Sequence, residues 1–190
     1  MKEYIQKQIK DSISAKEAML KPDFMDVISK IADSIVESLK NKNKLILFGN
    51  GGSASDAQHI AAELVGRFES ERRGLPAISL TVNTSNLTAI GNDYGFENVY
   101  SRQIEALAAK GDAAIGISTS GNSKNVIIAL KRAKELGIKT IGFTGIEKCQ
   151  MDDICDIVLH IPVKVTARIQ ECHILAGHII CGIIDKKMSF

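Results

Sequence analysis

The chain has 190 residues, of which 45% are hydrophobic and 24% are charged, an ordinary composition for a globular protein with a sizeable core. Its 24 basic and 22 acidic side chains give a net charge of +2 without a Lys/Arg block, which argues against nucleic acid or a membrane surface as a partner. No apolar stretch approaches the roughly 18 residues of a membrane span, and the charged N-terminus is unlike a signal peptide. Four cysteines without a CxxC pair favour a cytoplasmic chain with reduced thiols.

Two amphipathic helices are predicted ahead of the first strand. Ile5, Ile9 and Ile13 recur every four residues, which places a narrow apolar stripe on the first helix. The second helix is predicted to begin near Pro22, a residue suited to a first helical turn. Residues 1–42 are therefore expected to form a helical pair that covers a sheet edge or packs on other subunits, and the narrow isoleucine stripe favours the second option.

From residue 44 onward, short apolar runs alternate with longer segments of helical periodicity. Five runs have the pattern of strands buried on both faces: KLILFG, PAISLTV, AAIGIS, KTIGFT and DIVLHIP. A long final helix is predicted from about residue 166 to 187. The alternation predicts an α/β fold in three layers, a parallel five-stranded sheet flanked by helices, as a single domain spanning residues 1–190.

Two polar turns follow predicted strands at the end where parallel sheets bind ligands. The turn STSGNSKN, residues 118–125, carries Ser118, Thr119, Ser120 and Ser123 just before a helix. Hydroxyl groups, free backbone N–H groups and a helix dipole together favour an anion such as phosphate, although an N-cap with additional serines is the alternative. The turn GNGGS, residues 49–53, lacks both GxGxxG and a P-loop lysine, so a small phosphorylated ligand across both turns fits better than a nucleotide.

A histidine and an acid lie one helical turn apart after the GNGGS turn. His59 and Glu63 are four residues apart and face the same way on a helix. They could be an ordinary surface pair, which the spacing alone favours, or two ligands of a divalent ion, or a ligand and a base.

The last helix carries four polar residues in an otherwise apolar pattern: Gln170, Glu171, His173 and His178. We interpret His173 as a hydrogen-bonded core residue. Cys172 beside it raises a weak case for a thiolate metal site, because no second cysteine stands at ligand spacing.

Taken together, these motifs resemble the sugar isomerase (SIS) family. The resemblance rests on GNGGS, the helix DAQHIAAEL, GNDYGF at residues 91–96, STSGNS, and ARIQECHI with His178, in order along nearly the whole chain. Within the family, the match is to the isomerases of sedoheptulose 7-phosphate. It implies a zinc-dependent homotetramer that forms D-glycero-D-manno-heptose 7-phosphate through an enediol, the first step of ADP/GDP-heptose synthesis for surface glycans such as lipopolysaccharide.

The resemblance also implies roles for individual residues. The zinc ligands of the family fall on His59, Glu63, Gln170 and His178, with Glu63 as the base and His178 as the acid or shuttle. The sugar and phosphate contacts fall on Asn50, Gly51, Gly52, Ser53, Glu63, Arg67, Asn92, Asp93, Ser118, Thr119, Ser120, Ser123 and Gln170.

One geometric conflict and two rival functions remain open at this point. Gln170 and His178 are eight residues apart, about 12 Å along a straight helix, which is a long reach for one ion. Either both side chains reach toward the ion at full stretch, or parts of the site come from different subunits; we expect the second, with active sites at subunit interfaces. The rival functions are a non-catalytic sugar-phosphate-binding regulator, like a relative that associates with the replication initiator DnaA, and an isomerase for another sugar phosphate. The four metal-ligand positions together favour the enzyme.

Overall fold

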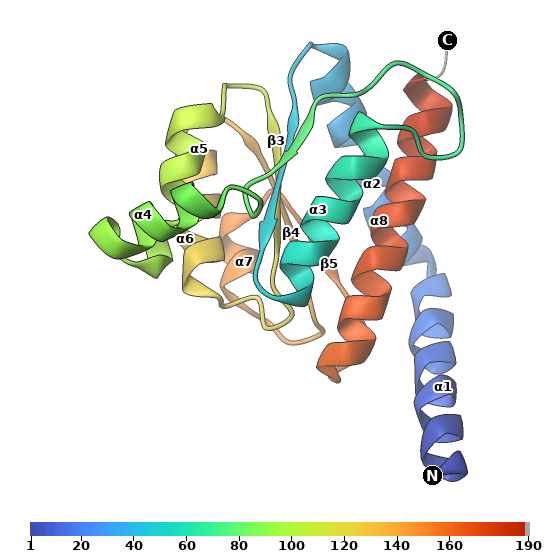
Figure 1. Cartoon of the computed structure of the whole chain (residues 1–190). Helices are drawn as coiled ribbons and strands as arrows, with labels where there is room; N and C mark the ends of the chain where they lie inside the picture. Colours follow the sequence, from blue (N-terminus) through green and yellow to red (C-terminus); the bar gives the residue numbers. More distant parts are fainter. Residues whose placement is uncertain (189–190) are drawn as a thin grey trace.

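The computed structural model describes residues 1–188 and contains a sheet of five parallel strands in the order β2-β1-β3-β4-β5 (Figure 1). Each predicted apolar run contains one strand, so the parallel five-stranded sheet is confirmed. Because β1 and β3 are neighbours and the chain proceeds outward from them in opposite directions, their carboxyl ends form the crevice in which such sheets bind ligands. The strands are β1 (Leu45–Gly49), β2 (Ala77–Ser79), β3 (Ala113–Ile117), β4 (Lys139–Thr144) and β5 (Ile157–His160).

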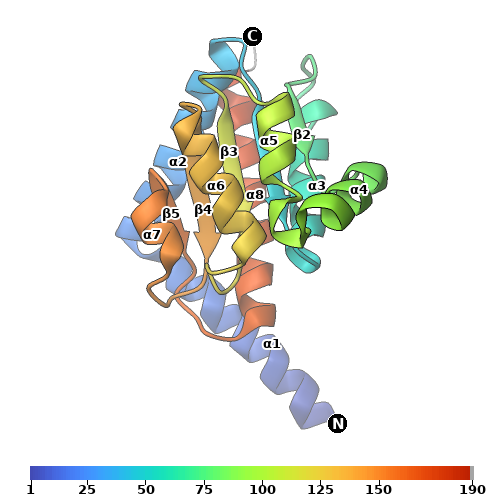
Figure 2. The ribbon, with the colours of Figure 1, turned by 90° about the vertical axis from the view of Figure 1, so that its left-hand side faces the viewer.

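Helices cover both faces of the sheet, which confirms the three-layer prediction (Figures 1 and 2). Along β1, Leu45 and Leu47 belong to the core on one face, whereas Ile46 and Phe48 belong to the core on the other, and all four are fully buried. This burial on both faces explains why the run is apolar without alternation. One face is covered by α2 (Pro22–Lys40), α3 (Gly52–Val65) and α8 (Thr166–Met188); the other is covered by α5 (Ser101–Leu107), α6 (Lys124–Glu135) and α7 (Gln150–Ile154).

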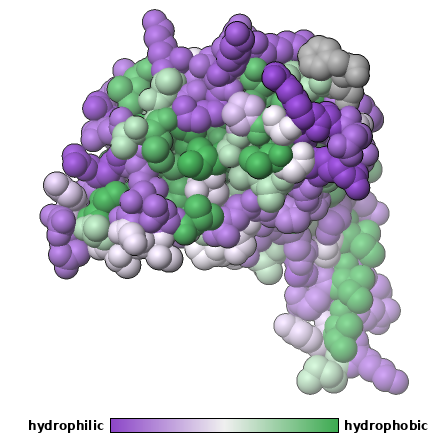
Figure 3. Space-filling view, turned by 45° about the horizontal axis from the view of Figure 1, so that its top comes forward, coloured by the Kyte–Doolittle hydropathy of each residue, from purple (hydrophilic) through white to green (hydrophobic). Residues whose placement is uncertain are grey.

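The two leading helices differ in what they bury. Pro22 occupies the first turn of α2, as predicted, and the apolar face of α2, including Ile31 and Ile35, lies in the core. In contrast, α1 (Lys2–Glu17) buries only Ala15 among its side chains and projects from the body of the molecule. Its isoleucine stripe is exposed, as the apolar band on the projecting helix in Figure 3 shows; Ile5, Ile9 and Ile13 are 51%, 56% and 51% exposed.

Polar contacts fasten α1 to the beginning of α8. Arg168 donates to the backbone carbonyl of Gln8 at 2.7 Å, and the Ser12 hydroxyl donates to a carboxylate oxygen of Glu171 at 2.7 Å. A short helix, α4 (Thr84–Tyr94), buries none of its side chains and lies at the outer side of the α5 and α6 layer (Figure 1). Among residues 1–188, no helix is both long and apolar enough to cross a membrane.

Candidate active site

The GNGGS turn connects the end of β1 to α3 by a path that requires glycine. Gly51 has φ +56°, in the left-handed region that side chains disfavour. A Cβ on Gly52 would lie 2.8 Å from Nε2 of Gln170, so the Gln170 amide rests directly against this turn. Ser53 is buried in the first turn of α3. The turn therefore brings bare backbone and the Gln170 amide to the β1/β3 crevice.

Two residues that the sequence analysis did not identify hold this turn in place. Asn50 and Asn125 exchange two amide hydrogen bonds, each 2.9 Å long, and thus join the GNGGS turn to the first turn of α6. The hydroxyl of Tyr100 donates to the carbonyl of Gly49 at 2.6 Å. Asn125 is 75 residues from Asn50 and Tyr100 is 51 residues from Gly49 along the chain, so no local pattern connects either residue to the turn.

The hydroxyl-rich turn after β3 forms the second wall of the crevice. The Ser118 hydroxyl lies 2.9 Å from that of Ser123 and 3.4 Å from that of Ser120. These hydroxyls surround the N-terminus of α6, whose first N–H groups have no partner within the helix. A hollow of about 350 Å³ adjoins the turn, lined in part by Thr119 and Ser120 and by Ile169 of α8. We refer to Ser118, Thr119, Ser120 and Ser123 as the hydroxyl cradle; its chemistry suits an anionic phosphate.

Within the turn that forms the hydroxyl cradle, the backbone at Gly121 packs closely against the side chain of Cys149. Gly121 has φ +65°, and a Cβ there would lie 2.2 Å from Sγ of the buried Cys149. Cys149 is in turn fixed by Asp152, whose carboxylate accepts the Cys149 backbone N–H at 2.8 Å. His160, a histidine for which the sequence suggested no role, lies 2.6 Å from the other carboxylate oxygen of Asp152. Glycine is required at position 121 by both conformation and space.

His59, Glu63 and His178 come together between α3 and α8. We call these three residues the donor triad, because each offers one ligand atom and all three atoms lie within 4.8 Å of one another. Nε2 of His59 lies 2.8 Å from Nε2 of His178 and 3.1 Å from a carboxylate oxygen of Glu63. Two imidazoles and a carboxylate with an open side are a common donor set for a catalytic divalent ion, so the residues fit a metal centre.

The surroundings of the donor triad combine an aromatic ring with a buried carboxylate. Phe68 stacks on the ring of His178 with centroids 5.7 Å apart. One turn before His59, Asp56 has a carboxylate oxygen that is buried and makes no hydrogen bond within the described residues. Burial raises the pKa of Asp56 to about 6, against the opposing effect of nearby His59. The sequence analysis did not single out Asp56, although its spacing from His59 is that of one helical turn.

On a single chain, the hydroxyl cradle and the donor triad are separate. His59 lies seven residues and Glu63 lies 11 residues beyond Gly52, about 10 Å and 16 Å along α3 away from the crevice. Gln170, which rests against Gly52, stays with the crevice rather than with His178. The predicted site thus consists of two groups of residues on each chain.

Three other predicted contact residues, Arg67, Asn92 and Asp93, are exposed and bond to near neighbours in the chain. Arg67 is exposed and pairs with Glu71 at 3.8 Å. Asn92 donates to Asp93 at 2.8 Å, and both are exposed on α4. Their roles in substrate binding stay predictions.

The interpretation of His173 as a core residue is confirmed. It is fully buried, its Nε2 lies 3.2 Å from the carbonyl of Thr144, and burial lowers its pKa to about 4. Cys172 is also fully buried, and burial raises the pKa of its thiol. Within residues 1–188, no cysteine joins a cluster of three metal-ligating side chains, which leaves the donor triad as the candidate metal centre.

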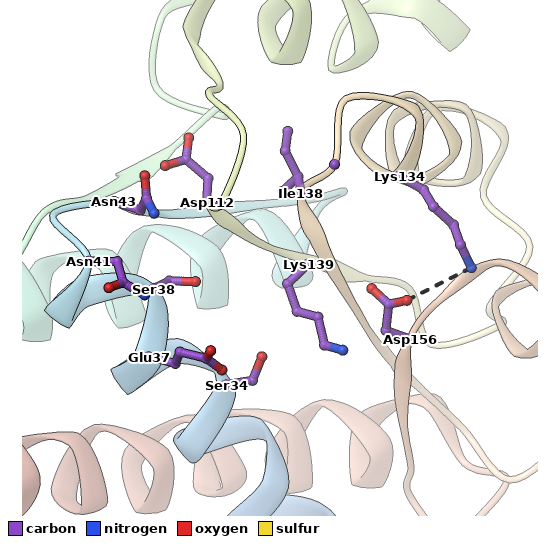
Figure 4. A pocket seen from close by; sticks show the side chains of 12 residues that line it. Ser34, Glu37, Ser38, Asn41, Asn43, Asp112, Lys134, Ile138, Lys139 and Asp156 are labelled. Carbon is purple, nitrogen blue, oxygen red and sulfur yellow. Dashed lines mark ion pairs between the residues drawn. The ribbon is translucent and has the colours of Figure 1, made fainter.

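A second hollow, of about 440 Å³, lies at the opposite edge of the sheet, where the strands begin (Figure 4). Lys139 and Asp112 line it from β4 and from the residue before β3, and Asn41 lines it from the end of α2. None of the predicted site residues contributes to it. The candidate active site therefore belongs to the carboxyl edge of the sheet and to the α3/α8 pair.

Comparison with known proteins gives concordant results. The model of the SIS domain matches residues 8–145. The phosphoheptose isomerase of Aliarcobacter butzleri is 57% identical over 183 residues, covering 95% of this chain and 97% of that protein. The phosphoheptose isomerase of Clostridium acetobutylicum is 51% identical over 189 residues, covering 99% and 96%. The solved structure of phosphoheptose isomerase from Neisseria gonorrhoeae superimposes with a TM-score of 0.91 at 43% identity, covering 97% of this chain and 98% of that one.

Proposed function

Because this chain belongs to the SIS-domain family and, within it, to the phosphoheptose isomerases, we propose that it converts D-sedoheptulose 7-phosphate into D-glycero-D-manno-heptose 7-phosphate. The observation that carries the proposal is the donor triad, which groups a carboxylate with two imidazoles. A protein that only binds a sugar phosphate needs the hydroxyl cradle, but it has no need of a base beside a metal-ligand set.

The reaction requires two proton movements between neighbouring carbons and their oxygens. The carboxylate of Glu63 takes a proton from C1 of the ketose while the carbonyl oxygen on C2 gains one, which gives an enediol. Glu63 then returns its proton to C2 as the hydroxyl on C1 loses its own and becomes the aldehyde. His178 carries the oxygen-bound proton, because imidazole exchanges protons readily near neutral pH. Atoms and electrons balance without a redox partner.

The metal that we propose for the donor triad is zinc, held by His59, Glu63 and His178, with Gln170 as a fourth ligand. When bound, zinc would supply Lewis-acid polarisation of the carbonyl oxygen. Glu63 cannot use one lone pair both to hold the metal and to take a proton, so its two carboxylate oxygens divide these tasks or one task is transient. The hydroxyl cradle holds the phosphate and thereby orients the far end of the substrate.

The separation of the two groups of residues supports a site shared between subunits. The distance along α3 between the crevice and the triad residues is about 10–16 Å, which is more than one side chain spans. Gln170 lies against Gly52, at the end of α3 that adjoins the crevice. A second chain that places its triad beside the first chain's cradle and Gln170 satisfies the fourth-ligand assignment. The exposed isoleucine stripe of α1 offers apolar surface for such an assembly, which we propose to be a homotetramer.

Activity is tested by NMR detection of the aldoheptose phosphate formed from sedoheptulose 7-phosphate by the metal-replete protein. Glu63→Gln keeps the shape of the side chain but removes the base, so turnover is expected to fall by roughly 10²- to 10⁴-fold. Glu37→Gln is the matched control, because Glu37 is exposed on α2 and belongs neither to the triad nor to the hydroxyl cradle. Chelation is expected to abolish turnover and added zinc to restore it. Wild-type protein without turnover, or equal effects of the two variants, would contradict the proposal.

The shared site is tested by mixing two inactive variants. Glu63→Gln disables the triad, and Ser120→Asp places a negative charge in the hydroxyl cradle where phosphate is expected. Because both changes leave the other group intact, random mixing at equal amounts restores about a quarter of the sites if triad and cradle come from different chains. A mixture that stays inactive refutes the shared site. Ser29→Asp, at an exposed position of α2, controls for added charge.

A further inference from the structure

The donor triad depends on how closely α3 and α8 pack, because His59 and Glu63 stand on one helix and His178 on the other. Next to these ligands, a Cβ on Gly177 would lie 2.6 Å from Cδ1 of Ile60, so the helices touch there without space for a side chain. Buried residues further along both helices, such as Leu64 of α3 and Ile180 of α8, belong to the same hydrophobic core. Apolar packing is not directional, so a polar attachment between the helices adds a restraint on the positions of the ligands that packing alone does not supply.

Arg72, in the segment between α3 and β2, provides a link to the end of α3. Its side chain is only 3% exposed. Nη2 donates to the backbone carbonyl of Glu63 at 2.9 Å, and Nη1 donates to that of Leu64 at 2.9 Å. These carbonyls belong to the last turn of α3, where the helix itself has no N–H groups left for them and where its dipole favours a cation. The Leu64 carbonyl also accepts the backbone N–H of Leu75 at 2.9 Å. Arg72 thus holds the backbone of the triad's carboxylate residue directly.

Asp185 provides the corresponding link to α8. It is fully buried and stands seven residues, or two helical turns, after His178, on the same side of the helix. One carboxylate oxygen accepts from Nε of Arg72 at 2.5 Å, and the other accepts the backbone N–H groups of Glu69 and Ser70 at 2.8 Å each. Burial raises the pKa of Asp185, but the hydrogen bonds from Ser70, Arg72 and Glu69 outweigh it, so the pKa lies below its usual value.

We propose that Arg72 and Asp185 form a positioning pair that sets the spacing of His59, Glu63 and His178. The chain of contacts is continuous: α8 holds Asp185, Asp185 holds the Arg72 side chain, and Arg72 holds the carbonyl of Glu63. The same carboxylate fastens the segment that carries Phe68, the ring stacked on His178. Arg72 and Asp185 are not catalytic residues, because neither offers a group to the triad's open space. This inference rests on the proposed function only in treating the triad as the metal and proton centre.

The pair also contributes to stability, so its positioning role needs a variant that keeps the charges. Removing one partner of a buried ion pair leaves the other charge uncompensated and is strongly destabilising. Arg72→Lys retains the cation beside Asp185 but lacks the planar fork that reaches the carbonyls of Glu63 and Leu64. Asp185→Asn is the second variant: it gives up the negative charge beside Arg72 but retains an oxygen for the backbone N–H groups of Glu69 and Ser70, so it is compared only if the chain folds. Arg73→Lys is the matched control, because Arg73 is the exposed neighbour.

The test compares these variants with the wild type by zinc titration of the metal-free protein and by steady-state kinetics. For Arg72→Lys and Asp185→Asn, zinc affinity is expected to fall roughly 10- to 100-fold, the usual effect of losing a group that orients a metal ligand. The value of kcat is expected to fall while KM is unchanged, because the hydroxyl cradle is untouched. A metal-free readout is the NMR shift of the His178 ring protons, which the stacked ring of Phe68 displaces; the displacement is expected to shrink.

The outcomes separate this proposal from the proposed function. A folded Arg72→Lys or Asp185→Asn chain with wild-type zinc affinity and wild-type His178 shifts overturns the positioning role and leaves the isomerase intact. A wild type that has no turnover refutes the isomerase, whereas the ring shifts still decide whether the pair positions His178. Effects of the same size in Arg73→Lys would also overturn the proposal.

Discussion

Substitution of Gly121 by alanine tests whether the hydroxyl cradle depends on the backbone conformation described above. Placing a Cβ at φ +65° costs about 1–2 kcal/mol. The Cβ would also lie 2.2 Å from Sγ of Cys149 and 2.7 Å from Oγ1 of Thr144, so these buried neighbours must move. Overpacking of this kind costs about 1–3 kcal/mol, which brings the expected loss to about 2–5 kcal/mol.

Thermal unfolding and substrate kinetics measure the two consequences of Gly121→Ala. For a chain of this length, the melting temperature is expected to fall on the order of 10 °C, and KM for the sugar phosphate is expected to rise because the turn shifts. Gly182→Ala is the matched control: it lies inside α8, and its Cβ would meet nothing closer than 3.6 Å. It is expected to leave stability unchanged or to raise it by up to about 1 kcal/mol.

A double substitution distinguishes strain from overlap. Cys149→Ala removes the sulfur atom, so in combination with Gly121→Ala it is expected to recover part of the stability but not the backbone strain. A Gly121→Ala protein that melts within 2 °C of the wild type and keeps its KM would refute the reasoning, because neither the left-handed turn nor the contact with Cys149 could then be present.

Three further predictions concern the site's supports and the exposed helix. Tyr100→Phe leaves the carbonyl of Gly49 without its donor and is expected to cost about 1–3 kcal/mol in chemical denaturation; a loss no greater than that of a surface Tyr4→Phe control would contradict it. Since burial raises the pKa of Asp56 from 3.8 to about 6, the stability this residue contributes is fully present below pH 3.8 and is lost as pH rises through 6. In metal-free protein, Asp56→Asn is therefore expected to raise the melting temperature at pH 7.5 but hardly at pH 4.5, and equal gains at both values would exclude this cause. Ile9→Lys places a charge in the exposed stripe of α1 and is expected to reduce the mass measured by light scattering toward the 20.6 kDa of one chain. An unchanged mass would show that the stripe of α1 does not hold the subunits together.

Local patterns were sufficient to predict the sheet and the hydroxyl cradle. The strands were evident because each lies in a continuous apolar run. The predicted burial on both faces holds for the central strands β1, β3 and β4, whereas β2 and β5 are only partly buried because they lie at the edges of the sheet. The cradle was evident because its four hydroxyls lie within six residues, directly before a helix. Likewise, the helical spacing of His59 and Glu63 predicted that they share a face, and they do.

Contacts between distant segments could not be predicted in this way. Asn125 reaches Asn50 across 75 residues, and Arg72 reaches Asp185 across 113, so no periodicity connects either pair. The resemblance placed Gln170 and His178 in one ligand set, but their positions at different ends of α3 follow from the packing of α8, which a motif does not describe. The motifs predict which residues carry chemistry, whereas the fold decides which of them meet on one chain.

The attachment of α1 to α8 couples the outer surface of the molecule to the crevice. Arg168 and Glu171, which hold Gln8 and Ser12 of α1, flank Gln170 on either side, and Gln170 rests on Gly52. These two hydrogen bonds therefore connect the projecting helix to the turn of α8 that carries Gln170. A partner chain that packs on the isoleucine stripe of α1 therefore also restrains the segment of α8 that places the Gln170 amide against Gly52.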